Sequence, residues 1–217
     1  MVVRQYSKIC LACESLKEEI SKLAPKCLKT KFYAIGLHES PAFLNKALQQ
    51  DILEEGCGRD VLLAYGFCSR STIGLFNPGG RLVLPRFHDC IQLLRRVGED
   101  ATGSYFLSPS WVRYGRTPLQ ERQQLIEKYG RETGEWIFDS VYRHYRRIIY
   151  IDTMNDGETV NETLYQARET ARRLQWDFMV EQGTVDRLER LLKGCWESAD
   201  FLVLAPGQKV EESMFFK

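Results

Sequence analysis

The stretch that decides the fold is residues 60–67, DVLLAYGF, an almost uninterrupted apolar run that ends at Cys68. Such a continuous run is typical of a strand that is buried on both faces of a parallel sheet. A second short apolar run, residues 81–84 (RLVL), follows it and is stopped by Pro85. The turn-forming sequence 77–80 (NPGG) lies between them and separates the two predicted strands.

Working outward from this stretch, β-rich and helical segments alternate. Ser40 followed by Pro41 is a strong helix start, because serine is a favoured N-cap and proline a favoured first residue. Residues 105–114 are aromatic and resemble a loop, and Gly130 and Gly134 should divide residues 119–146 into two helices. The remaining predicted strands are 6–13, 31–37, 147–152, 178–181 and 201–205, and the remaining helices are 16–23, 41–55, 88–96, 161–174 and 185–192.

This alternation predicts an α/β fold with a mostly parallel sheet, or sheets, and flanking helices. The pattern on both sides of a helical insert allows one large sheet or two Rossmann-like lobes. We expect an N-terminal α/β lobe at 1–100 that carries a Cys/His cluster. An aromatic loop and helical insert should follow at 101–146, and a C-terminal α/β lobe with its tail at 147–217.

The composition is that of a globular protein, with 44% hydrophobic and 27% charged residues. The net charge of +1 gives no overall field for nucleic acid, so a nucleic-acid partner is not expected. No apolar stretch reaches the roughly 18 residues of a membrane span, and the N-terminus lacks a signal-peptide pattern. We therefore expect a cytoplasmic protein without a membrane partner, whose seven cysteines are reduced.

Soft ligand residues fall where the predicted strands end, which is where parallel sheets bind ligands. Cys68 follows the strand at 60–67, and His88-x-Cys90 follows the strand at 81–84. We predict that Cys68, His88 and Cys90 form a metal site, with Cys10 as a fourth ligand. Thiolate and imidazole ligands favour zinc first, with iron or an iron–sulfur cluster as alternatives. The predicted helix beginning near His88 would also lower the pKa of Cys90.

Five further residues complete the predicted site. Arg86 could hold an anionic group of a substrate or cofactor through its forked guanidinium. Asp89 could orient His88 or, like His38, transfer protons. Tyr65 and Trp111 are predicted, together with Arg86, to contact a cofactor.

The remaining cysteines leave alternatives open. Cys10-x-x-Cys13 lacks the second pair that a zinc ribbon needs, so it could be a redox pair or two small buried residues. Cys27, Cys57 and Cys195 have no companion ligands in the sequence. A nucleophile elbow, a P-loop and a dinucleotide-binding glycine motif are all absent from the sequence, which disfavours those enzyme classes.

Residues 60–68 and the string Pro85-Arg86-Phe87-His88-Asp89-Cys90 resemble the prokaryotic family described as domain of unknown function 1638. Cys10, His38-x-x-Pro41, the segment from Tyr105 to Trp111 and the pattern Gly194-x-Trp196 with Phe201-Leu-Val are similar to that family too. The resemblance covers most of the chain. It carries no established activity, but members occur beside corrinoid-dependent methyl-transfer proteins. The chain lacks the Asp-x-His-x-x-Gly signature of proteins that ligate cobalt with histidine.

Three functions follow from these observations. The first is a metalloprotein of one-carbon or corrinoid-linked methyl metabolism, whose partners are a small-molecule or cofactor ligand and corrinoid or methyltransferase proteins. The second is a non-catalytic cofactor carrier or maturation factor. The third is a metal-free enzyme with Cys68 or Cys90 as nucleophile and His88 as base.

Overall fold

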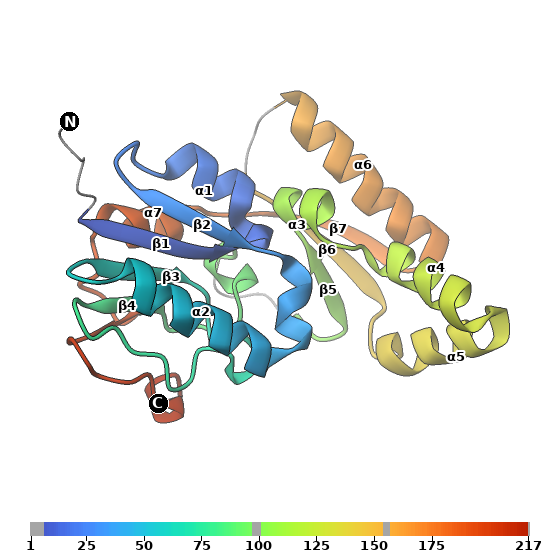
Figure 1. Cartoon of the computed structure of the whole chain (residues 1–217). Helices are drawn as coiled ribbons and strands as arrows, with labels where there is room; N and C mark the ends of the chain where they lie inside the picture. Colours follow the sequence, from blue (N-terminus) through green and yellow to red (C-terminus); the bar gives the residue numbers. More distant parts are fainter. Residues whose placement is uncertain (1–6, 97–100, 154–156, 217) are drawn as a thin grey trace, which may run out of the picture. The chain divides into compact units, whose positions relative to one another are not determined.

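Figure 1 shows the computed structural model, which describes residues 7–96, 101–153 and 157–216. The chain forms two compact units. Unit 1 contains Met1–Leu94 and Thr184–Lys217, and unit 2 contains Arg95–Gly183. The last helix and strand of the chain thus return to unit 1, whereas the sequence grouped them with residues 147–183 in a C-terminal lobe.

Unit 1 is built on a sheet whose described strands follow the order β2-β1-β3-β4-β8. The first four strands are parallel, and β8 pairs with β4 in the antiparallel direction. The strands are β1 (Lys8–Cys13), β2 (Lys29–Tyr33), β3 (Asp60–Ala64), β4 (Leu82–Pro85) and β8 (Phe201–Leu204).

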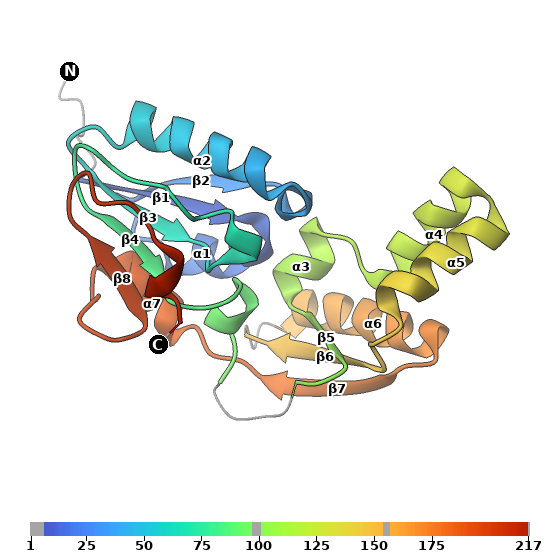
Figure 2. The same ribbon diagram turned by 90° about the horizontal axis from the view of Figure 1, so that it is seen from below.

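Helices cover both faces of this sheet. α2 (Pro41–Glu55) lies over one face, and α1 (Lys17–Leu23) and α7 (Asp186–Lys193) lie over the other (Figures 1 and 2). This double covering explains why Leu62 and Leu63, neighbours in β3 that point to opposite faces, are both fully buried.

The strand order reverses between β1 and β3, since the chain leaves β1 toward β2 and later continues from β3 toward β4. In an open α/β sheet such a reversal leaves a crevice at the carboxyl ends of the two strands, where the connecting segments diverge. Here Cys13 is the last residue of β1, and the segment from Tyr65 to Cys68 directly follows β3. This edge of the sheet is therefore where the fold would bind a ligand.

Unit 2 contains a smaller parallel sheet, with its described strands in the order β5-β6-β7. α6 packs on one face, where Leu107, Ile148 and Tyr150 form the centre of a buried core (Figure 2). The elements are β5 (Ser104–Leu107), α3 (Pro109–Tyr114), α4 (Pro118–Tyr129), α5 (Arg131–Tyr142), β6 (Arg147–Asp152), α6 (Gly157–Leu174) and β7 (Asp177–Gln182).

The predicted α/β class with mostly parallel sheets and flanking helices is confirmed. The prediction of a loop at 105–114 was wrong, because most of it forms β5 and α3. The helix expected at 88–96 is also absent, and only Ile91–Leu93 forms a single 3₁₀ turn there. Within the described residues, no helix is both long and apolar enough to cross a membrane.

Candidate thiol site

Cys13 ends β1 at the edge where ligands are expected. β1 lies between β2 and β3, so that its residues from Ile9 onward are buried. Cys13 is 5% exposed, and the 3₁₀ helix Glu14–Leu16 that follows it buries Ser15 completely. Cys10 lies three residues earlier in the same strand, and strand residues three apart point to opposite faces. Cys13 and Cys10 therefore cannot serve the same site.

Gly66 determines how the segment after β3 meets the segment after β4. A Cβ atom on Gly66 would lie 2.4 Å from the carbonyl oxygen of Phe87 and 2.9 Å from the amide nitrogen of Asp89. Only glycine permits this close approach of the two backbones. The pairing continues beyond Gly66, as the amide of Phe67 donates to the Phe87 carbonyl (2.7 Å) and that of Cys68 to the His88 carbonyl (2.8 Å).

Cys68 begins a strained turn. Cys68, Ser69 and Arg70 have φ values of 44°, 54° and 71°, in the left-handed region that non-glycine residues rarely adopt. Consecutive residues in this region cost free energy and persist only where the surroundings impose them, and such positions concentrate at functional sites. The thiol of Cys68 is half-buried, in contrast with the buried thiols near it.

Three thiols meet here, and we call Cys13, Cys90 and Cys68 the thiol chain. Hydrogen bonding with Cys90 affects the pKa of Cys13, and hydrogen bonding with Cys13 and Cys68 affects the pKa of Cys90, so Cys90 lies beside both other thiols. The Ser15 hydroxyl lies 3.0 Å from the Cys90 sulfur. The chain thus runs from a buried end at Cys13, through Cys90 at 7% exposure, to the half-buried Cys68.

Burial and hydrogen bonding keep the inner two thiols protonated. The bond to Cys90 and burial raise the pKa of Cys13 well above its ordinary value. The bond with Cys13 lowers the pKa of Cys90, but the bond with Cys68 and burial outweigh it, so the pKa of Cys90 is also raised. At neutral pH both groups are therefore protonated thiols rather than thiolates.

Tyr65 places a phenol beside the thiol chain. Its ring is 2% exposed and packs edge-on against Tyr33, with ring centroids 6.4 Å apart. The Tyr65 hydroxyl is buried, and it has no hydrogen-bond partner among the residues that the structure describes. Burial raises its pKa well above 10, and the nearby thiols Cys13, Cys68 and Cys90 raise it further. The phenol is therefore a neutral donor whose hydrogen bond is unused.

A family model described as a protein of unknown function (DUF1638) matches residues 32–192, most of the chain. The chain belongs to this family. No curated protein and no solved structure matches it. Within the DUF1638 match lie Tyr65, Cys68 and Cys90, whereas Cys13 and Ser15 precede it.

His88 does not join the two thiols with which the sequence grouped it. Its ring is exposed and lies against Phe216, with ring centroids 5.1 Å apart. The amide of His88 donates to the Gln92 side chain at 3.1 Å, and the amide of Gln92 donates to the Asp89 carboxylate at 3.0 Å. These two bonds form a compact turn that turns Cys90 inward and leaves His88 outside. The predicted helix dipole at Cys90 is absent, and the pKa of Cys90 is raised rather than lowered.

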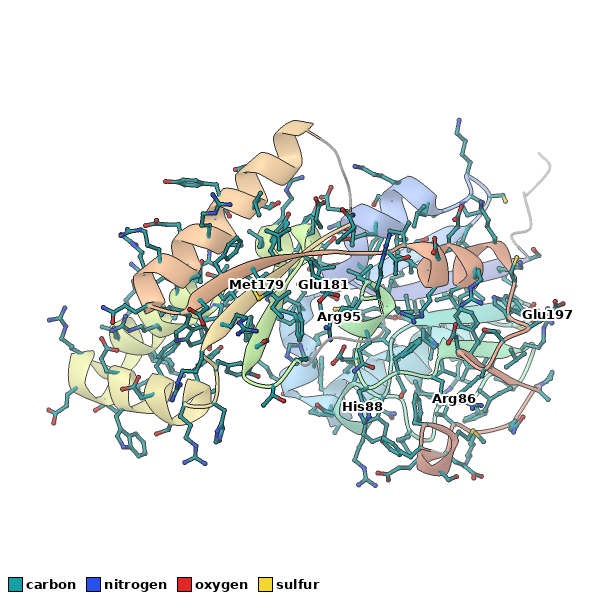
Figure 3. All side chains as sticks on the ribbon, turned by 180° about the vertical axis from the view of Figure 1, so that it is seen from behind. Arg86, His88, Arg95, Met179, Glu181 and Glu197 are labelled. Carbon is teal, nitrogen blue, oxygen red and sulfur yellow. The ribbon has the colours of Figure 1, made fainter. Side chains whose placement is uncertain are left out.

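The other predicted residues belong to different elements of the two units. His38 lies in the 3₁₀ helix Ile35–Glu39 after β2, and its Nδ1 is 2.5 Å from the carbonyl of Ile35. Arg86 follows β4 (Figure 3). Its buried Nε has no hydrogen-bond partner among the described residues. Trp111 belongs to unit 2, where it packs on Tyr105 and donates to the carbonyl of Arg116 at 3.1 Å.

The predicted metal site stays a prediction, for which the described side chains give no support. Across residues 7–96, 101–153 and 157–216, no group of three or more His, Cys, Asp or Glu is arranged to hold a metal ion. Cys10, the predicted fourth ligand, lies fully buried between β2 and β3, and burial raises its pKa to about 12. Cys13 and Ser15 are the members of the site that the sequence reasoning did not select. One sequence signal was available: Cys10 and Cys13 are three residues apart in a predicted strand, so they point to opposite faces and only one of them can join the site.

Proposed function

We propose that this protein is a cysteine-dependent enzyme in which Cys68 is the nucleophile toward a small ligand and Tyr65 donates a hydrogen bond to that ligand. The unpartnered hydroxyl of Tyr65 carries the proposal. An unsatisfied buried hydroxyl destabilises a protein by about 1–3 kcal/mol. A ligand atom that accepts its hydrogen bond would remove this cost, at the position where a doubly covered α/β sheet binds ligands.

Cys68 is the thiol best suited to attack a ligand. It is the most exposed member of the thiol chain and lies in a left-handed turn at the end of a central strand. The thiol of Cys90 lies beside it as a hydrogen-bonding neighbour. A thiolate is the reactive form of cysteine.

Arg86 supports an anionic group on the ligand. Its buried Nε lacks a partner, and it lies at the same carboxyl edge of the sheet as the thiol chain. The forked guanidinium suits a carboxylate or a phosphate. The ring of His88 is exposed and packs on Phe216, so the proposal does not use His88 as the base.

The other hypotheses from the sequence differ in support. Zinc, iron and iron–sulfur binding have no fitting ligand group among the described residues, and we derive no step through a metal. A role in one-carbon or corrinoid-linked metabolism stays a prediction, as does a carrier or maturation function.

The rates of thiol alkylation test the nucleophile. We expect iodoacetamide, added to the reduced full-length protein at neutral pH, to label Cys68 at least tenfold faster than Cys13 and Cys90. Mass spectrometry of the peptides separates these sites from the exposed Cys27, Cys57 and Cys195. If Cys68 reacts as slowly as the two buried thiols, the proposed nucleophile is wrong.

Two conservative variants test whether the Tyr65 hydroxyl lacks a hydrogen-bond partner. Tyr65→Phe removes a hydroxyl without a partner, so the variant should be as stable as the wild type or more stable by about 1 kcal/mol. Tyr33→Phe is the matched control, because the hydroxyl of Tyr33 donates to the carboxylate of Asp51. Loss of that bond should destabilise the protein by roughly 1.5–3 kcal/mol. If both variants are destabilised equally in urea unfolding, the Tyr65 hydroxyl does have a hydrogen-bond partner and the argument for a ligand at this position fails.

A further inference from the structure

We propose that Cys68 and Cys90 form a reversible disulfide, so that the site exchanges two electrons with a low-molecular-weight disulfide. This inference rests on the proposed function, because it takes Cys68 as the thiol that meets the ligand. It adds a substrate class and gives Cys90 the role of the resolving thiol.

The backbone brings the two residues within reach of each other. β3 and β4 are adjacent parallel strands, in which Val61 pairs with Leu82 and Leu62 with Val83. The amide of Cys68 still bonds to the carbonyl of His88, two residues before Cys90. Neighbouring strands lie about 4.8 Å apart, and a disulfide needs Cα atoms roughly 4.4–6.8 Å apart. The side-chain hydrogen bond between the two thiols agrees with this proximity.

The thiols differ in exposure, and this difference indicates which of them reacts first with a dissolved disulfide. Cys68 is half-buried and can meet a dissolved disulfide, whereas Cys13 and Cys90 are only 5% and 7% exposed. Cys90 contacts both other thiols and Ser15, so it lies at the centre of the cluster. A mixed disulfide formed at Cys68 would therefore have the Cys90 sulfur as its neighbour.

The proposed exchange balances in two steps. The Cys68 thiolate attacks one sulfur of the substrate disulfide, which forms a mixed disulfide and releases one substrate thiolate that takes up a proton. The Cys90 thiol then loses its proton and attacks the Cys68 sulfur, which releases the second substrate thiol and leaves the Cys68–Cys90 disulfide. The two cysteines are oxidised by two electrons, and the substrate disulfide is reduced to two thiols.

Oxidised glutathione is the probe for this exchange. The full-length protein carries Cys27→Ser, Cys57→Ser and Cys195→Ser to remove the exposed thiols. It is reduced, exposed to the probe without oxygen, quenched in acid and mapped by mass spectrometry. We expect a cross-linked Cys68–Cys90 peptide that dithiothreitol reverses. With Cys90→Ser the second step is blocked, so glutathione should accumulate on Cys68.

Cys10→Ala is the matched control, because it removes a fully buried thiol of the same strand that points to the opposite face from Cys13, so it should leave the cross-link unchanged. Glutathione that stays on Cys68 of the protein with an intact Cys90 would overturn the disulfide but leave the proposed nucleophile in place. A Cys13–Cys90 cross-link would overturn the assigned pair. A Cys68 that reacts neither with glutathione nor with iodoacetamide would contradict both proposals.

Discussion

Substitution of Gly66 by alanine should disrupt the contact that brings the thiol chain together. The new Cβ would lie 2.4 Å from the Phe87 oxygen, 2.9 Å from the Asp89 nitrogen and 3.0 Å from the Phe87 carbonyl carbon. All three are backbone atoms, which no side-chain rotation can move. The segment after β4 would therefore have to shift away from the segment after β3.

The cost has two parts. Overpacking of a tight contact destabilises a protein by about 1–3 kcal/mol. The shift would also weaken the backbone bonds from Phe67 and Cys68 to the Phe87 and His88 carbonyls, each worth about 1 kcal/mol. We expect a total of about 3 kcal/mol, and at roughly 2–4 °C per kcal/mol for a chain of this size the melting temperature should fall by about 6–12 °C.

Scanning calorimetry is the assay, because it resolves the transitions of the two units where they unfold separately. Gly36→Ala is the control, since its nearest atom would be 4.0 Å away and the site is exposed. This control should change stability by less than about 0.5 kcal/mol. Equal melting temperatures for the two variants would refute the close approach at Gly66. Because Gly66→Ala moves the segment after β4 away from the segment after β3, it should also lower the yield of the Cys68–Cys90 cross-link.

Three further substitutions probe the rest of the fold. Leu62→Ala should destabilise unit 1 by about 2–5 kcal/mol in urea unfolding, because Leu62 is fully buried in β3. Burial raises the pKa of Asp60, but the hydrogen bonds and charge of Arg81 outweigh it and hold that pKa below its ordinary value. The pair thus stabilises the protein above about pH 4 and loses its effect as the pH falls through the lowered pKa. Asp60→Asn should therefore cost about 0.5–1 kcal/mol at pH 7 and almost nothing near pH 2 in pH-dependent unfolding. Glu181→Gln should destabilise unit 2 by roughly 2–3 kcal/mol in thermal unfolding, since it removes the charge of a carboxylate that accepts hydrogen bonds from the largely buried Arg95 through both oxygens. Figure 3 labels both residues.

Much of the fold could be predicted because its strongest signals are local. The apolar run at 60–67 and the shorter run at 81–84 became adjacent parallel strands, and Ser40-Pro41 begins α2. The prediction of a loop at 105–114 was wrong because this segment contains parts of two short elements. Its first residues belong to the four-residue strand β5, and Ser108 then caps the short helix α3. The antiparallel direction of β8 depends on the return of the chain to unit 1, for which the sequence carries no local signal.

The candidate site was predictable at the level of the sheet edge but not of its members. The rule that ligands bind at strand ends selected Tyr65, Cys68 and Cys90, which the structure brings together. It could not choose between Cys10 and Cys13, which point to opposite faces of the sheet. That choice depends on the face on which the segment after β4 places Cys90. It also could not show that the ring of His88 packs on Phe216, more than a hundred residues later in the chain.

The strand order explains why these thiols meet. Cys13 ends β1 and Cys68 follows β3; these two strands are separated by α1, β2 and α2 in the sequence but are neighbours in the sheet. Cys90 reaches them because β4 adds on the other side of β3, and Gly66 lets the two following segments touch. Apart from the half-buried Cys68 in its left-handed turn, each residue alone is an ordinary buried cysteine, tyrosine or glycine. Their chemistry arises from the reversal of strand order, since a different order would leave the same residues at the same strand ends but out of contact.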